Sequence, residues 1–166
     1  FTTRNSNSLF SGGGNFTFLL RTMATAGACV SYTYEFEDVI IEGSVFNDAN
    51  GNTIINSGET FTTLPAPLYV YLVDSSGIVV DSANVLPNGS YTMAASPNQT
   101  YTIELSSVQY PEGTNINTTP VNNNPPTGFV TTGENGDANS GFGDLDPNGV
   151  LTVIVGTTNL TNKNFG

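Results

Sequence analysis

The stretch "CVSYTYEFEDVIIEGSVF", Cys29 to Phe46, decides the fold class of this chain. Apolar side chains occupy every second position in its first half: Val30, Tyr32, Tyr34, Phe36. Polar side chains lie between them: Ser31, Thr33, Glu35, Glu37. Successive side chains of a strand point to opposite faces, so this alternation predicts half-buried β-strands and not a helix. The second half, "VIIEGSVF", continues directly as a further predicted strand.

The same pattern extends in both directions along the chain. Before this stretch, "NFTFLLRT" (15–22) places Phe16, Phe18 and Leu20 on one face. After it come six more predicted strands: "LYVYLVD" (68–74), "GIVVDSA" (77–83), "GSYTMAA" (89–95), "QTYTIELSS" (99–107), "GVLTVIVG" (149–156) and "NLTNKNFG" (159–166). Turn signals such as "DSSG", "PNG" and "DPNG" separate most of them. Short strands spaced in this way predict an all-β, antiparallel sandwich or barrel.

Three regions fall outside the alternation. Residues 1–14 are polar and end in "SGGG", which is typical of a flexible arm. Residues 111–126 form a long loop rich in Pro and Asn, and residues 133–149 form an acidic, glycine-rich loop. We therefore divide the chain into an N-terminal arm with extra β strands, 1–38, and a β-sandwich, 39–166.

Charge restricts the partners. The chain has 14 acidic and three basic residues, Arg4, Arg21 and Lys163, and a net charge of -11. No basic patch can form, so the sequence predicts no nucleic-acid partner and no anionic membrane partner. No apolar run approaches the ~18 residues of a transmembrane helix. Few charges among abundant Asn, Thr, Ser and Gly favour an extracellular or cell-surface protein.

The residue types in the chain do not favour a catalytic function. The chain contains no histidine, which removes Ser-His and Cys-His nucleophile systems and histidine zinc sites. The single cysteine, Cys29, can form no intramolecular disulfide. We therefore expect that this protein is not an enzyme.

Several motifs together resemble a known repeat. They are "IEGSVFNDANGN" (41–52), "LYVYLVDSSGIVV" (68–80), "NGSYTM" (88–93), "TYTIEL" (100–105), "PTGFVTTGENG" (126–136) and "PNGVLTVIVGTTNLTNKNFG" (147–166). Their order is similar to the B-type repeat of the serine-aspartate repeat and collagen adhesins. The later motifs are closer to repeats of large Bacteroidetes surface adhesins. The resemblance covers residues 39–166. It implies an immunoglobulin-like or transthyretin-like β-sandwich in an extracellular adhesin, stalk or filament.

One loop has the spacing of a calcium site. Counted from Asp48 as position one, oxygen-bearing side chains follow at positions three, five, nine and twelve: Asn50, Asn52, Asn56, Glu59. Ile54 at position seven offers its backbone carbonyl. This is the register of an EF-hand loop, which surrounds calcium with hard oxygens. Thr53 stands at position six, where that loop has glycine. The alternative is a polar connection rich in Asx turns, with Glu59 in solvent.

A second acidic loop contains Glu134, Asp137, Asp144 and Asp146. Its spacing matches no known calcium loop, so we expect a solvated acidic loop here in preference to a second metal site.

We expect a structural subunit, stalk or adhesin domain that contacts other copies of itself or neighbouring repeats head-to-tail. The arm provides a hypothesis of strand donation, because an alternating apolar segment follows a flexible one. The alternative function is a carbohydrate- or ligand-binding module, with a surface glycan or a protein as its partner.

Overall fold

Strands form where the alternation of apolar residues predicts them. The computed structural model describes residues 31, 37–118, 123, 125–136 and 146–166. The strands in them are β1 (Val39–Ser44), β2 (Tyr69–Val73), β3 (Val79–Asn84), β4 (Ser90–Ala95), β5 (Gln99–Ser106), β6 (Glu134–Asn135), β7 (Val150–Val155) and β8 (Asn164–Phe165). No helix occurs among the described residues, and the strand pairs are antiparallel, which confirms the all-β prediction.

The other predicted strands, in residues 15–22 and 29–36, lie outside the described residues apart from residue 31. The expectation of an arm over residues 1–38 therefore stays a prediction. Within the described part of the chain, no helix has the length and apolarity that a membrane crossing needs.

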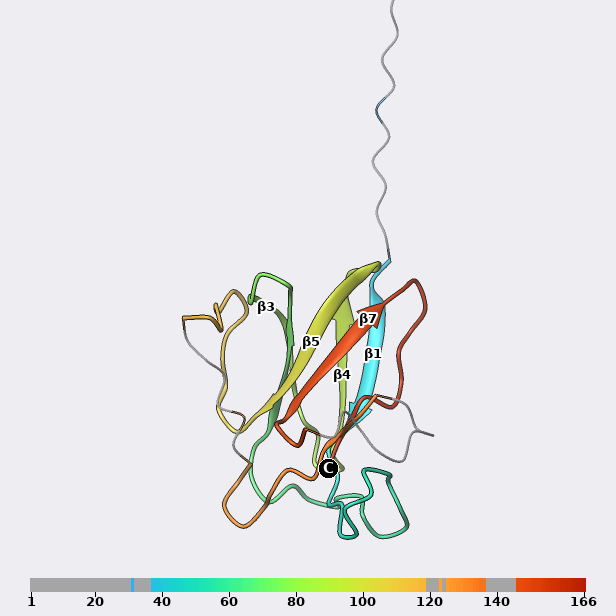
Figure 1. Cartoon of the computed structure of the whole chain (residues 1–166), viewed down its shortest axis with the longest axis vertical. Coiled ribbons are helices and arrows are strands. Elements are labelled where there is room, and N and C mark those ends of the chain that lie inside the picture. The colour runs from blue at the N-terminus through green and yellow to red at the C-terminus, as the bar shows by residue number, and fades with distance from the viewer. Residues whose placement is uncertain (1–30, 32–36, 119–122, 124, 137–145) are drawn as a thin grey trace, which may run out of the picture. The chain divides into compact units, whose positions relative to one another are not determined.

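Four strands form the larger sheet, in the order β3-β2-β5-β7. Figure 1 shows β5 beside β7 in this sheet. Tyr69 at the start of β2 lies opposite Asn84 of β3 and Ser106 of β5. Gln99 at the start of β5 lies opposite Val155 at the end of β7. Each strand runs antiparallel to its neighbours. Because β3 and β7 come first and last in the order, they form the two edges of this sheet.

The end of the chain extends the pairing around β1. On one side β1 pairs with β4, with Val39 opposite Ala95. On its other side the Glu42 amide donates to Leu160 O (2.8 Å), and the Leu160 amide donates to Ile40 O (2.9 Å). This contact is parallel, and β8 pairs in turn with β6. The predicted strand 159–166 is therefore regular only at β8.

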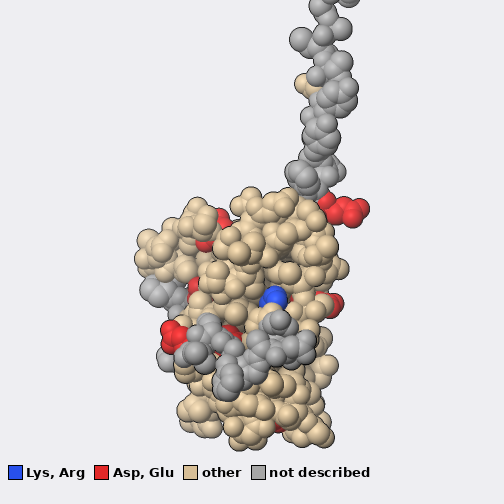
Figure 2. Space-filling view, turned by 45° about the vertical axis from the view of Figure 1, so that its right-hand side comes forward, with Lys and Arg blue, Asp and Glu red and all other residues tan. Residues whose placement is uncertain are grey.

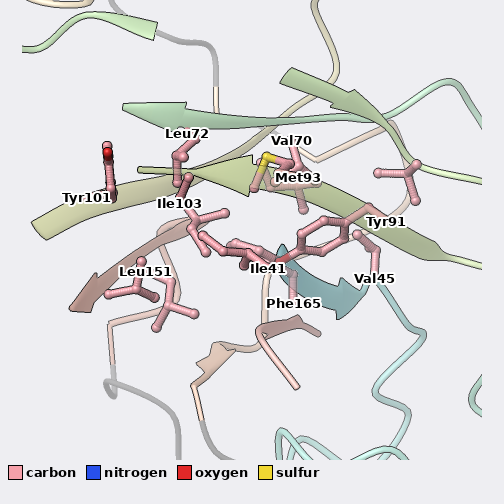
Figure 3. Close-up of a cluster of buried hydrophobic side chains, with 14 of the residues drawn as sticks. Ile41, Val45, Val70, Leu72, Tyr91, Met93, Tyr101, Ile103, Leu151 and Phe165 are labelled. Atoms are coloured by element: carbon pink, nitrogen blue, oxygen red, sulfur yellow. The ribbon is translucent and has the colours of Figure 1, made fainter. Parts of the chain in front are cut away.

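One hydrophobic core lies between these two sets of strands. Figure 3 shows Ile41 of β1, Met93 of β4, Ile103 of β5 and Phe165 of β8 packed together, and all four are buried. The alternation explains this, because the inward positions of each strand are the apolar ones. The two sets of strands therefore form a sandwich-like arrangement. The finer immunoglobulin-like or transthyretin-like assignment remains a prediction.

A smaller cluster lies on the outer face of the larger sheet. Tyr71, Val73 and Val79 are buried there, and Tyr110 and Ile116 from the loop after β5 pack against them. The Tyr71 hydroxyl donates to Val108 O (2.8 Å) and accepts from the Tyr110 amide (2.7 Å). Ile116 lies within the predicted Pro/Asn-rich loop 111–126, so this part of the loop packs against the sheet.

Asp81 links the edges of the two sets of strands. Its Oδ1 accepts from the Ser82 amide of β3 (2.8 Å), and its Oδ2 accepts from the Ala94 amide of β4 (2.7 Å). An exposed strand edge can pair with another chain, and a charged side chain is one of the features that prevent it. Asp81 therefore closes the β3–β4 side of the domain.

The buried carboxyl of Glu104 in β5 should make the stability of the domain depend on pH. Burial raises the pKa of this carboxyl above its ordinary 4.5, against an opposing hydrogen bond from Asn123. The folded protein therefore keeps a proton that the unfolded chain releases, so stability falls as pH rises from 4.5 through the raised pKa. We expect Glu104→Gln to remove this fall, measured by urea unfolding between about pH 4 and pH 7. Exposed Glu112→Gln is the control and should keep it. Equal pH dependence in E104Q and the parent would contradict the expectation.

Candidate cation-binding loop

The loop from Asp48 to Glu59 begins where β1 leaves the sheet. The Phe46 amide donates to Phe165 O (2.9 Å), and the Asn47 amide donates to Glu59 O (2.9 Å). The second of these bonds joins the two ends of the loop. The twelve residues therefore form a closed turn attached to the core through β1 and β8.

Asp48 organises the first half of the loop. Its side chain is only 8% exposed. Its Oδ1 accepts from the Asn52 amide (3.1 Å), and its Oδ2 accepts from the Thr53 amide (2.8 Å) and the Thr132 hydroxyl (2.8 Å). Burial alone would raise the pKa of this carboxyl, but the backbone and hydroxyl donors outweigh it and lower the pKa. The loop therefore holds an ionised carboxylate at position one.

Thr53 has the backbone conformation for which the EF-hand loop uses glycine. Its φ is 57°, in the left-handed region that a β-branched residue rarely adopts. The conformation is held on both sides, because the Thr53 amide donates to Asp48 and the Asn135 side chain donates to Thr53 O (2.9 Å). Strained backbone of this kind clusters at functional sites. The substitution of glycine by threonine at position six therefore leaves the turn intact.

Three oxygens of the loop converge on the side-chain amide of Asn56. Asn56 Nδ2 lies 3.2 Å from Asn52 Oδ1, 2.7 Å from Ile54 O and 3.1 Å from Glu59 Oε2. An amide nitrogen has two protons to donate, so three acceptors exceed its capacity. Glu59 Oε2 also accepts from the Asn56 backbone amide (2.7 Å). Asn52 Oδ1 likewise accepts from the Ile54 amide (2.9 Å). The three oxygens therefore converge at one point, each with a donor inside the loop.

The six predicted ligand residues fall into two hydrogen-bonded groups: Asp48, Asn50, Asn52, Ile54, Asn56, Glu59. Oxygens of Asp48 and Asn50 accept from the Asn52 amide (both 3.1 Å), whereas the other oxygens converge on Asn56 Nδ2. A cation site shared by all six stays a prediction. The alternative of a solvated Glu59 is wrong, because this side chain is 6% exposed. The Asx turns of that alternative are present at Asn50 and Asn52, whose Oδ1 atoms accept from amides two residues ahead. These turns orient the side-chain oxygens.

The oxygens of the loop suit a hard cation, but only two of the six residues carry a negative charge. Two carboxylates, two or three amide oxygens and one backbone carbonyl match the oxygen ligands of calcium. The described residues contain no group of three or more His, Cys, Asp and Glu side chains that could hold a metal. A cation here would therefore depend on neutral oxygens, and such sites bind weakly, at roughly 10⁻⁴–10⁻³ M.

The second acidic loop differs from the expectation. Glu134 lies in β6 and is fully buried, at 0% exposed, so the prediction of a solvated loop is wrong at this residue. Its Oε1 accepts from the Gly149 amide (2.6 Å), which connects β6 to the start of β7. Asp146 is exposed, as expected, and Asp137 and Asp144 lie outside the described residues.

Two residues that the sequence did not single out support the first loop. Thr132 donates to Asp48, and Asn135 donates to Thr53 O, from positions 84 and 82 residues further along the chain. Nothing in the local spacing around Asp48 indicates these contacts. The sequence marked the segment "PTGFVTTGENG" only as part of the resemblance and not as part of a site.

An apolar pocket lies beside the loop. Its volume is about 190 Å³, and Asp48 and Thr132 line it on one side. Phe61 and Phe129 also line it, with ring centroids 6.2 Å apart at an interplanar angle of 64°. The contact between Thr132 and Asp48 therefore joins the wall of this pocket to the candidate cation site.

Substitution of Gly51 by alanine tests the left-handed backbone conformation in the loop. Its φ is 69°, and a Cβ added there would meet nothing within 4 Å, so Gly51→Ala changes only backbone strain. We expect a loss of about 1 kcal/mol in urea unfolding. Gly156→Ala is the matched control, because it also has open space but no positive φ, and it should be neutral or slightly stabilising. Equal stabilities of the two variants would contradict the left-handed turn.

The chain was compared with family models, with curated proteins and with solved structures, and none of them matches it.

Proposed function

We propose that this chain is a structural domain of an extracellular surface protein or filament, and that calcium stiffens its Asp48–Glu59 loop. It contacts other copies or neighbouring repeats head-to-tail and acts as a spacer or stalk. A large adhesin at the cell surface is the context that its composition and motif order favour.

The convergence of oxygens on Asn56 is the observation that carries the cation part of this proposal. A cation at this point would be contacted from positions five, seven and twelve, at Asn52, Ile54 and Glu59. For Asn56 itself to bind, its side-chain amide would turn so that Oδ1 and not Nδ2 faces the cation. The oxygen and nitrogen of an amide differ only by such a rotation, so the change requires no movement of the backbone.

The predicted affinity supports an extracellular location. Calcium sites of the 10⁻⁴–10⁻³ M class occur in extracellular modules, where the ion is abundant. A loop with two carboxylates belongs to this class and is unsuited to sensing. Calcium would then act as a permanent clip that holds the two ends of the loop, Asp48 and Glu59, together.

Thermal melting in calcium and in EDTA tests the cation site. A ligand that binds only the folded state adds RT ln(1 + [L]/Kd), which is about 1.4–2.7 kcal/mol at 10–100 times Kd. We expect about 10 mM calcium to raise Tm by several degrees, and Glu59→Gln to abolish the rise. Glu112→Gln, which changes an exposed carboxylate outside the loop, should keep it. An unchanged Tm of the parent across millimolar calcium would overturn the cation site.

The pocket beside the loop supports the alternative of a ligand-binding module. Phe61 and Phe129 give it an aromatic lining, and aromatic side chains are common where proteins bind small ligands. NMR titration with glucose, galactose and N-acetylglucosamine tests this alternative. Shifts confined to residues 128–132, and lost in Phe129→Ala, would favour it over a purely structural role. No shifts up to about 50 mM of each sugar would remove these sugars as ligands.

A further inference from the structure

In the part of the chain that the structure describes, no strand pairs with the outer edge of β7. Among the described residues, β5 is its only strand neighbour. The Leu105 amide donates to Gly149 O (2.9 Å), so Leu105 and Gly149 form a hydrogen-bonded pair of the β5–β7 ladder. Such pairs alternate with non-hydrogen-bonded ones. The amides and carbonyls of Thr152 and Ile154 therefore point away from β5.

The side chains on this edge do not block pairing. Residues 150–155 contain no charge and no proline. Leu151, Val153 and Val155 are buried in the core, whereas Thr152 is exposed and Ile154 is 78% exposed. Natural edge strands usually carry lysine, proline or a bulge that prevents pairing with other chains. On the opposite side of the domain, Asp81 of β3 accepts from β4, whereas β7 itself has no charged residue.

The charge distribution indicates what could pair with it. Residues 1–34 contain Arg4 and Arg21 and no acidic residue, whereas residues 35–166 hold one lysine against all 14 carboxylates, a net charge of -13. Figure 2 shows one face of the molecule, with a single blue patch and several separate red ones. The N-terminal segment thus carries the opposite charge to the domain. Its stretch 15–22 also alternates as a strand.

We propose that residues 15–22 of a neighbouring copy add to β7 as an antiparallel strand. This rests on the head-to-tail assembly proposed above and names its contact surface. With Phe18 opposite Thr152, Phe16 lies opposite Ile154 and covers its exposed side chain. Arg21 then lies beyond Val150, toward the exposed carboxylate of Asp146. Main-chain hydrogen bonds provide the affinity, and the apolar pairs and charges fix the register.

Amide exchange measured by NMR tests the proposal on the full chain, with a reductant present because of Cys29. The probes are the amides of Thr152 and Ile154. The Val150 amide is unsuitable, since it donates to Asn148 Oδ1 (2.8 Å) within the domain. We expect amide exchange at Thr152 and Ile154 to slow at least about tenfold when the protein concentration rises from ~10 µM to ~1 mM. Mass action requires this dependence on concentration if a second copy binds. Light scattering should show assembly over the same range.

Two variants identify the contact. Phe18→Asp should abolish both the slow exchange and the assembly, whereas Asn7→Asp adds the same charge outside the segment and should keep both. Thr152→Pro removes one outward donor and leaves the ladder with β5 intact, so the domain should fold and fail to assemble. Slow exchange that is independent of concentration would overturn docking from a second copy.

Failure of this contact can be separated from failure of the proposed function. Assembly while Thr152 and Ile154 exchange freely would overturn the β7 contact and leave head-to-tail association standing. A chain that stays monomeric at ~1 mM would overturn both the contact and the association. The calcium response of the loop is measured independently of either result.

Discussion

Asp48→Ala will destabilise the domain by about 3 kcal/mol and remove its response to calcium. The carboxylate accepts from the amides of Asn52 and Thr53 and from the Thr132 hydroxyl. Alanine removes the acceptor of the Thr53 amide and the Thr132 hydroxyl, whereas the Asn52 amide keeps Asn50 Oδ1. Each unsatisfied buried donor costs about 1–3 kcal/mol. The Thr53 donor is the most costly of the three, because Thr53 is 6% exposed and its strained conformation depends on this bond. Urea unfolding with and without calcium measures both effects.

Asp74→Ala is the matched control for this substitution. Asp74 Oδ1 accepts from the amides of Ser76 and Ile78 in the turn between β2 and β3, so it caps a turn as Asp48 does. It lies outside the candidate site, and its loss should cost about 1 kcal/mol, as for a capping residue. The calcium response should survive. If both variants lose similar stability and both respond to calcium, Asp48 has no special role.

Because the pKa of Asp48 is lowered, the loss of stability caused by Asp48→Ala should depend on pH. A carboxyl whose folded pKa lies below its ordinary 3.8 stabilises the folded state above pH 3.8, and this contribution disappears as pH falls through the folded pKa. The difference in free energy of unfolding between the parent and Asp48→Ala should therefore narrow below about pH 4. A constant difference down to about pH 2 would contradict an ionised Asp48.

Phe165→Ala will have the largest effect on stability, about 3–5 kcal/mol, because it removes a fully buried aromatic side chain from the core. The ring of Phe165 lies 6.3 Å from that of Tyr91, and its backbone oxygen accepts from the Phe46 amide. The residue therefore joins the end of the chain to β1 and β4. Urea unfolding at constant m measures the loss.

Two further variants keep this result interpretable. Phe165→Leu retains most of the apolar volume and should lose less than Phe165→Ala, so a stability can be measured even where alanine prevents folding. Val130→Ala changes a side chain that is 78% exposed and should stay within about 0.5 kcal/mol of the parent. If Phe165→Ala were as mild as Val130→Ala, the end of the chain would not belong to the core.

Much of the fold could be predicted because it depends on local alternation. The predicted stretches at 68–74, 77–83, 89–95, 99–107 and 149–156 each contain a strand of the structure, with ends shifted by at most a few residues. Strand faces are fixed by a period of two, and that period can be read without knowing the partner. The stretch 159–166 was predicted as one strand, but only Asn164–Phe165 forms a regular strand. Asn159 and Leu160 contact β1 through individual hydrogen bonds instead.

The sequence could single out the residues of the candidate site, which stays a prediction, but it could not identify the residues that support the loop. The twelve-residue register is local, so the positions from Asp48 to Glu59 follow from spacing alone. The left-handed Thr53 could not be predicted, because its conformation depends on hydrogen bonds from Thr53 to Asp48 and from Asn135 to Thr53. Asn135 comes from β6, a strand of two residues, which is too short to leave an alternation in the sequence.

The sequence by itself determined the strand-forming segments, the acidic charge, the lack of histidine chemistry and the oxygen spacing of the loop, because each depends on residue type and near neighbours. Only the tertiary structure decided that Glu134 is buried, that Asp81 links β3 to β4 and that no described strand pairs with the outer edge of β7. These depend on which segments meet after folding. Contacts between residues more than 80 positions apart, such as Thr132 with Asp48, have no local signature.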